Sequence, residues 1–207
     1  MALDLNLIPN DAKKVDRPLA KAGSQPARIA QVIDLGVQVR TAYKGKEKAP
    51  ARQVLFNHEL VTDEYEFEDK KVRQRIATKA FTVVGKNSEK YNNSNLADYL
   101  TAVDPSDTTK GKLAELAGMP LLVIVTHVEG IGKHQGRKFA NITRVMQPPE
   151  GYPIPELSEP SVVFDFDNPT EEAWKAIPLF IQEKIKFAVN YKGSQVEALV
   201  NKLGVTK

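Results

Sequence analysis

The stretch from Met119 to Pro148 reads MPLLVIVTHVEGIGKHQGRKFANITRVMQP. It holds two runs rich in β-branched and apolar residues, 121–128 and 137–146, separated by a glycine-rich segment. This pattern is typical of a β-hairpin. The connection and the start of the second run carry four basic or titratable side chains, Lys133, His134, Arg137 and Lys138. The sequence therefore predicts a hairpin with a cationic tip, which is suited to holding a polyanion.

Three more strands are predicted before this hairpin, over 27–39, 52–61 and 76–84. Gly36 lies inside the first of them and indicates a bulge or bend. Between the third and fourth strands, Asn95 can cap a short helix that Pro105 ends. Three strands, a helix and two strands follow the order of an OB-fold. We therefore expect a mainly β protein, a five-stranded β-barrel of the OB-fold type with a helix between strands 3 and 4, plus C-terminal helices.

The C-terminal part differs in charge from the rest of the chain. Residues 150–174 hold seven acids and no Lys or Arg. Helix-capping patterns at Asn168–Glu171 and Ser194–Glu197 predict helices there. The expected organisation is an extended or mobile N-terminal arm over 1–25, the barrel over 26–149, and an acidic connector with a helical segment over 150–207. The helical segment would pack on the barrel or on a partner.

Composition narrows the chemistry that the chain can perform. It has 207 residues and no cysteine, which excludes disulfides, thiolate zinc sites and cysteine nucleophiles. The glycines of 130–136 do not match a phosphate loop, since Lys133 precedes His134 and a strand follows. No run is long and apolar enough to span a bilayer. We expect no catalytic activity, no cofactor, no metal, no membrane association and a cytoplasmic location.

Two pairs of aspartates leave a minor alternative open. Asp104 with Asp107, and Asp165 with Asp167, offer carboxylates that could hold Mg²⁺ in a nuclease. Turn and helix-cap roles are the competing interpretation for residues in such polar segments.

Binding of single-stranded nucleic acid needs cations for phosphates and aromatic faces for unpaired bases, each stack contributing about 1–3 kcal/mol. Phe56 is expected in the core. For Phe81 the sequence leaves two roles open, packing in the core or stacking on a base. The full candidate set consists of Arg40, Tyr43, Lys44, Lys46, Lys48, Arg52, Tyr65, Phe67, Lys70, Lys71, Arg73, Arg75, Lys79, Phe81, Lys133, His134, Arg137, Lys138 and Phe139.

Several segments also resemble one family. They read PARIAQVIDLGVQ (26–38), PARQVLFNHEL (50–60), GMPLLVIVTH (118–127), NITRV (141–145) and IPLFIQEKI (177–185). Over about residues 26–190 the chain resembles bacteriophage single-stranded DNA-binding proteins of the OB-fold type. The resemblance implies a protein that coats and protects strands during phage DNA replication or recombination in the host cytoplasm. Its implied partners are single-stranded DNA, replication or recombination proteins, and further copies of itself.

One departure from that family concerns the C-terminus. Such proteins commonly end in an acidic tail that recruits replication partners, whereas this chain ends NKLGVTK. Its acidic stretch, 150–174, is internal and could instead compete with the ligand for the cationic groove. The alternative from another functional class is a structural or assembly protein of a phage particle, in which the terminal helices make subunit contacts.

Overall fold

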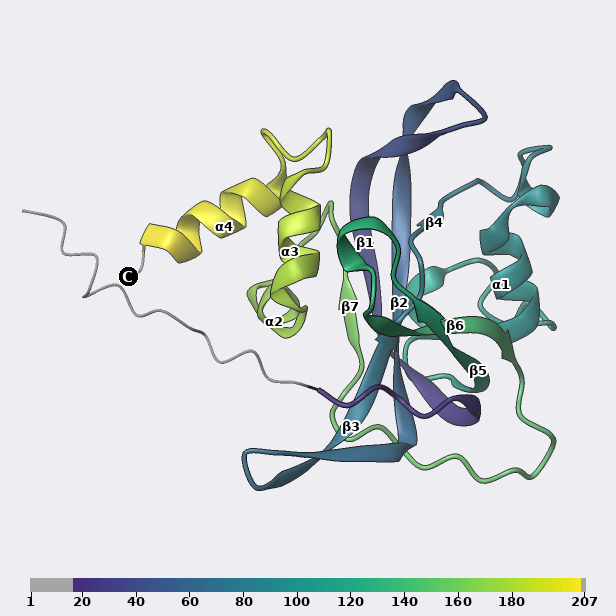
Figure 1. Ribbon diagram of the computed structural model, residues 1–207. Helices are drawn as coiled ribbons and strands as arrows, with labels where there is room; N and C mark the ends of the chain where they lie inside the picture. The colour runs from purple at the N-terminus through teal and green to yellow at the C-terminus, as the bar shows by residue number, and fades with distance from the viewer. Residues whose placement is uncertain (1–16, 206–207) are drawn as a thin grey trace, which may run out of the picture.

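The computed structural model describes residues 17–205, apart from the side chains of Tyr43, Lys133 and Val205. The protein is mainly β, with short helices around one sheet (Figure 1). Its strands are β1 (Gly23–Tyr43), β2 (Lys46–Phe67), β3 (Lys70–Ala77), β4 (Phe81–Thr82), β5 (Pro120–Glu129), β6 (Lys138–Met146) and β7 (Val162–Phe164). Its helices are α1 (Asn95–Val103), α2 (Glu171–Ala176), α3 (Leu179–Lys186) and α4 (Gln195–Val205), with 3₁₀ turns η2 (Tyr91–Asn93), η3 (Leu113–Leu116) and η4 (Gly132–His134). None of the helices within 17–205 has the length and apolar character needed to cross a bilayer.

The sheet is open, which corrects the expectation of a closed barrel of five strands. Antiparallel ladders run in the order β3-β2-β1-β5-β6, while β4 adds to β2 and β7 pairs in parallel with β1. The end strands β3 and β6 come close to each other, but no ladder joins them in the described part of the chain. The predicted third strand, 76–84, is also interrupted: Thr78 N and Val83 N donate to Phe56 O and Arg52 O, so the chain stays along β2 from β3 into β4.

Two hairpins are longer than the sequence predicted. The first two strands were predicted over 27–39 and 52–61, but β1 and β2 pair as far as Tyr43 and Lys46 around a two-residue turn. The charged segment between the predicted strands 52–61 and 76–84 is also paired, since β2 and β3 form a ladder as far as Phe67 and Lys70. Both turns place two consecutive residues at positive φ, which matches the twist of a tight hairpin. Charge on an exposed ribbon therefore did not interrupt the strands.

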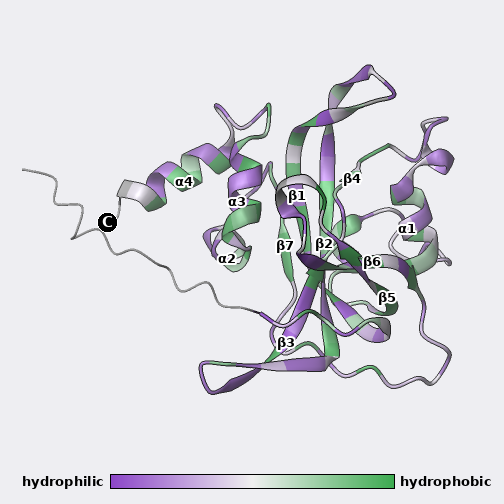
Figure 2. Ribbon diagram, in the orientation of Figure 1, coloured by the Kyte–Doolittle hydropathy of each residue, from purple (hydrophilic) through white to green (hydrophobic). Residues whose placement is uncertain are grey.

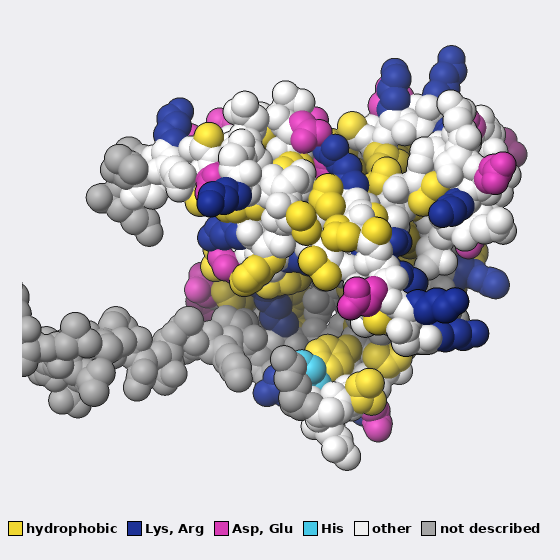
Figure 3. Space-filling view, turned by 90° about the horizontal axis from the view of Figure 1, so that it is seen from above, with side chains coloured by type: hydrophobic (Ala, Val, Ile, Leu, Met, Phe, Trp, Pro, Cys, Tyr) yellow, Lys and Arg dark blue, Asp and Glu magenta, His cyan; other side chains and the backbone are white. Residues whose placement is uncertain are grey.

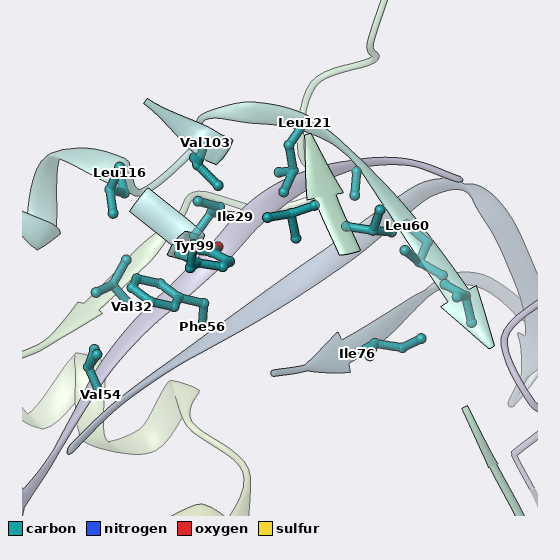
Figure 4. Close-up of a cluster of buried hydrophobic side chains, with 14 of the residues drawn as sticks. Ile29, Val32, Val54, Phe56, Leu60, Ile76, Tyr99, Val103, Leu116 and Leu121 are labelled. Carbon is teal, nitrogen blue, oxygen red and sulfur yellow. The ribbon is translucent and has the colours of Figure 1, made fainter. Parts of the chain in front are cut away.

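Two apolar clusters lie on opposite faces of the β1–β2 pair. The first joins β1, β2, β5 and β6 to α1, and Figure 4 shows Tyr99 of α1 lying against Phe56 of β2 within it. The second joins Ile33, Leu35 and Leu55 of the sheet to β7 and α2–α4, around Trp174 and Ile181. Figure 1 accordingly shows α1 on one side of these strands and α2–α4 on the other. The C-terminal helical segment thus shares a core with the sheet.

Gly36 marks a bend in β1 beside the second cluster. The β1–β2 register is irregular between Asp34 and Val37, which confirms the bulge predicted at this glycine. Gly36 has a φ of +69°, and a Cβ atom there would lie 2.6 Å from the ring of Phe166. Only glycine therefore allows β1 to bend where Phe166 packs against its backbone.

Arg28 attaches the acidic connector to the sheet. Its guanidinium donates to the carbonyls of Gly118, Ile154 and Pro155 at 2.9, 3.1 and 2.8 Å, and it forms a 2.7 Å ion pair with Glu156. Because Arg28 lies on β1, the segment around 154–156 is held beside this strand.

Candidate nucleic-acid interface

The β1–β2 hairpin ends in a two-stranded ribbon that extends beyond the neighbouring elements (Figure 1). Between residues 39 and 50 the described side chains are exposed except that of Arg40, whose Nε donates to Ala49 O at 2.7 Å. This ribbon carries the predicted cations Lys44, Lys46 and Lys48 along with Arg40, and Glu47 is its only acid. The ribbon is therefore an accessible cationic surface. The side chain of Tyr43, a predicted stacking group, lies outside the described atoms.

The tip of the β5–β6 hairpin is held by backbone hydrogen bonds. Gly130 N donates to Arg137 O at 2.7 Å, and Arg137 N donates to His134 O at 3.1 Å. A Cβ on Gly130 would lie 2.2 Å from His134 O, so the turn requires glycine there. The His134 ring meets Phe139 edge-on at 5.8 Å, and Phe139 remains 39% exposed.

This arrangement brings several predicted side chains of the β5–β6 tip together. Arg137 and Lys138 are exposed next to the aromatic pair. Phosphate-neutralising cations and an exposed ring are thus combined at one hairpin, which is what an unpaired strand requires. The side chain of Lys133 lies outside the described atoms.

The end of the β2–β3 hairpin is not a positive surface, although it holds predicted cations. Residues 64–73 place Glu64, Glu66, Glu68 and Asp69 among Lys70, Lys71 and Arg73, so their charges offset one another. Lys71 faces Glu66 across the ladder, and Arg73 faces Glu64. The predicted aromatics Tyr65 and Phe67 are half-buried here. This end is mostly hydrophilic in Figure 2.

Arg52 is held within the protein by three carboxylates. Its guanidinium donates to Asp34 at close range, lies 2.7 Å from Asp167, and approaches Asp165 at 4.0 Å. The hydrogen bond with Asp34 is the main reason that the pKa of Arg52 is raised above its ordinary value. Arg52 thereby joins β1 and β2 to the segment that follows β7, a structural role that the charge pattern did not indicate.

Arg73 and Arg75 are both tied to Glu59, whose side chain has no exposure. Their guanidiniums lie 3.2 and 2.9 Å from its carboxylate, and Ser158 donates to it through its backbone N at 2.8 Å and its Oγ at 2.7 Å. Burial alone would raise the pKa of Glu59, but the hydrogen bonds from Ser158 and Arg75 outweigh it and keep that pKa below its ordinary value. Arg73 also donates to Glu156 O at 2.6 Å. These contacts fix the connector against β2 and β3.

The predicted cations therefore fall into two groups. The four predicted arginines of β1–β3, namely Arg40, Arg52, Arg73 and Arg75, all bond to acceptors within the protein. In contrast, no hydrogen bond or ion pair within residues 17–205 involves the side chains of Lys46, Lys70, Lys71, Lys79, Arg137 or Lys138. The planar guanidinium suits several fixed acceptors at once, whereas an ammonium on a flexible stem stays hydrated. Seen from above, basic side chains stand around the edge of the molecule, with hydrophobic ones between them (Figure 3).

A cleft of about 670 Å³, here called the seam cleft, opens between β4, α1 and β6. Phe81 forms part of its wall and also joins the core, with ring centroids 5.1 Å from Tyr99 and 5.9 Å from Phe56. Phe81 is thus partly buried against the core and also borders a cleft, so its stacking role stays a prediction. Residues lining the seam cleft include Lys79, Phe81, Asn95, Tyr99, Asn141 and Arg144.

A second hollow, of about 510 Å³, lies between the outer face of β2–β3 and the α2–α3 turn. Its lining includes Tyr65 and the exposed Phe180, and its bases are Arg17, Arg73, Arg75 and Lys175. Glu159 is also present and lies 3.7 Å from Arg75. Because Arg73, Arg75 and Lys175 already pair with carboxylates, this hollow offers less uncompensated charge than the hairpin tips.

The aspartates of the nuclease alternative serve local structure. Asp104 accepts hydrogen bonds from the backbone N and the hydroxyl of both Thr108 and Thr109, and the Thr109 backbone bond is the main reason that its pKa is lowered. Asp107 pairs with Lys86, and Asp165 accepts from Asp167 N at 2.8 Å. Among the residues that the structure describes, no three His, Asp or Glu side chains cluster as a metal site.

Comparison with protein-family models, curated proteins and solved structures gave no match. The resemblance to phage single-stranded DNA-binding proteins accordingly remains a prediction.

Sequence reasoning also missed Arg144, which lines the seam cleft without any intramolecular partner within residues 17–205. The only signal was the Thr143-Arg144 pair, which interrupts the alternation of apolar residues in NITRV.

Proposed function

We propose that the protein is a non-catalytic single-stranded DNA-binding protein that coats and protects strands during phage DNA replication or recombination. The observation that carries this proposal is the pair of cationic hairpins: the β1–β2 ribbon with Lys46, and the β5–β6 tip with Arg137, Lys138 and the exposed ring of Phe139. Free lysines and arginines can neutralise phosphates, and the ring can stack on a base.

The strand order supports an OB-fold relationship as part of this proposal. The OB-fold is a partly open Greek-key barrel of five strands, and its strand 2–3 face and two hairpin loops bind oligonucleotides. The order β3-β2-β1-β5-β6, with α1 between β3 and β5 in the chain, fits that plan once the two short strands are set aside. The β1–β2 and β5–β6 tips would then correspond to those two loops.

Fluorescence anisotropy with a labelled oligothymidylate tests the proposal. Single strands should bind more tightly than a duplex of the same length, because only unpaired bases expose their faces for stacking. With four to six phosphates neutralised, log K should fall with log salt at a slope of about −3 to −4. Substituting Arg137→Ala and Lys138→Ala together should reduce that slope by about 1.4. Equal affinity for single strands and duplex would show that base stacking does not contribute to binding, which contradicts that part of the proposal.

A structural or assembly role in a phage particle is the second candidate, and one observation favours it. Leu179 and Phe180 at the start of α3, and Phe187 and Val189 after its end, are 77%, 70%, 78% and 57% exposed. An apolar surface of this kind is typical of protein contacts. Failure to bind any oligonucleotide, together with incorporation into particles, would support this role instead.

A further inference from the structure

The seam cleft combines three kinds of side chain that are not found together at either hairpin tip. Its lining includes the aromatic residues Phe81 and Tyr99, the amide residues Asn95 and Asn141, and the bases Lys79 and Arg144 together with the acid Asp98. Lys79 and Arg144 are exposed and make no ion pair within residues 17–205. The volume of about 670 Å³ falls in the range of small-molecule sites, which span about 300–1,000 Å³.

A β-bulge in β6 turns Arg144 toward solvent. Ile142 is opposite Val125 and Arg144 is opposite Ile124, which leaves Thr143 as the extra residue. Ile142 packs against the first core cluster and Val145 is buried in it. Without the extra residue, strict alternation from Ile142 would direct Arg144 into that core. Bulges often redirect side chains next to binding sites, and this one places a guanidinium at the cleft.

The free edge of β6 supplies further polar groups. β6 is the last strand in the sheet order, and no ladder joins its second edge in the described part of the chain. Consecutive residues 141–145 all line the seam cleft, although Ile142 and Val145 face the core while Thr143 and Arg144 are exposed. The cleft therefore runs along this edge, where backbone N–H and C=O groups can donate to and accept from a ligand.

We propose that the seam cleft binds one unstacked nucleobase together with its adjoining phosphate. This inference rests on the proposed function and adds a subsite between β4, α1 and β6. The base would lie against Phe81, with Asn95 and Asn141 available to its polar edge, while Lys79 and Arg144 hold the phosphate. A base offers an apolar face and hydrogen-bonding edges, which matches a cleft lined by both aromatic and amide residues.

The test uses the double variant Lys79→Ala/Arg144→Ala on the full chain. Its matched control is Lys110→Ala/Lys192→Ala, which removes two exposed lysines that line neither hollow and belong to no hairpin. Anisotropy is measured with an oligothymidylate and with an equally long strand that has abasic sites, across a salt series. The cleft variant should bind the oligothymidylate about tenfold more weakly than the control, and its salt slope should fall by about 1.4. Phe81→Leu should reduce the preference for the base-bearing strand.

The outcomes separate this inference from the proposed function. If the wild-type protein binds no oligonucleotide, both are wrong. If it binds and the cleft variant equals the control, the subsite is wrong, and the hairpins alone carry binding. If the cleft variant weakens binding but the wild-type protein binds base-bearing and abasic strands equally, the cleft holds phosphate only and the base-binding role is overturned. Thermal unfolding checks Phe81→Leu, and the abasic comparison tests base binding independently of that variant.

Discussion

The imidazole of His58 and the phenol of Tyr99 share a 2.8 Å hydrogen bond inside the core, joining β2 to α1. His58 has no exposure and Tyr99 is 5% exposed. Burial lowers the pKa of His58 to about 4 and raises that of Tyr99 well above its ordinary value. Both side chains are therefore neutral at pH 7. Tyr99 also stacks on Phe56 at 4.5 Å and lines the seam cleft, so this pair connects the core to one side of the cleft.

Acidification should destabilise the protein through His58. Its pKa in the folded protein, about 4, lies below the ordinary value of 6.5, so the unfolded chain binds this proton more tightly. The stability associated with neutral, buried His58 is fully present above pH 6.5 and is lost as the pH falls toward 4. The difference between the two pKa values corresponds to about 3 kcal/mol in the free energy of unfolding.

Urea unfolding between pH 7.5 and 4.5 measures this effect, with His58→Gln as the reference. Carboxylates contribute to acid sensitivity in both proteins, so only the difference between the two profiles reports on His58. The difference in free energy of unfolding between the wild-type protein and His58→Gln should shrink as the pH falls. Parallel profiles over the whole range would show that His58 does not titrate in this way.

Removing the charge of Glu59 should loosen the connector. Glu59→Gln leaves Arg73 and Arg75 without their buried carboxylate partner, which should lower the free energy of unfolding by about 2–3 kcal/mol. Limited proteolysis should then cleave more rapidly near Ser158, which Glu59 holds. Glu64→Gln, at a more exposed position, is the control and should change neither quantity measurably. Equal proteolysis of both variants would contradict the role assigned to Glu59.

The strands of the core could be predicted from the sequence because local patterns decide them. The alternation in 27–39 and 52–61 and the paired runs of 121–128 and 137–146 all correspond to observed elements. The short helix predicted after a cap at Asn95 is α1, but the side chain that caps it is that of Ser94, one residue earlier. The hairpin formed by β5 and β6 was also predicted, because glycines separate its two apolar runs. Each of these features depends on neighbours in the chain.

Long-range features could not be predicted in the same way. Whether the sheet closes depends on pairing between its end strands β3 and β6, which are distant in the chain, and no local pattern indicates whether they pair. The ion pairs of Arg52 and Arg75 involve carboxylates distant in the chain, Asp167 and Glu59 among them, so both arginines resembled free cations in the sequence. Only tertiary contacts separate the arginines that support the fold from the lysines that remain available.

Alanine at Gly130 should disrupt the β5–β6 tip. Its Cβ would lie 2.2 Å from the backbone oxygen of His134, which cannot move without breaking the turn. Gly130→Ala should lower the free energy of unfolding by about 1–3 kcal/mol and weaken oligonucleotide binding. Gly85→Ala is the control, since a Cβ there has open space and its φ is ordinary. If Gly130→Ala disrupts the turn but binds the oligonucleotide as tightly as the wild-type protein, the β5–β6 tip is not part of the interface.

Substituting Arg52 should lower stability and substituting Lys46 should weaken DNA binding, although both residues lie on β2. Arg52→Ala leaves Asp34 and Asp167 without their shared partner and should cost about 1–2 kcal/mol in the free energy of unfolding, since Arg52 is partly exposed. Its salt slope for oligothymidylate binding should equal that of the wild-type protein. Lys46→Ala, which removes an exposed and unpaired cation, should leave stability unchanged and reduce the slope by about 0.7. Denaturation and a salt series on both variants measure the two effects. A slope reduced as much by Arg52→Ala as by Lys46→Ala would mean that the ligand displaces the carboxylates and that Arg52 belongs to the interface.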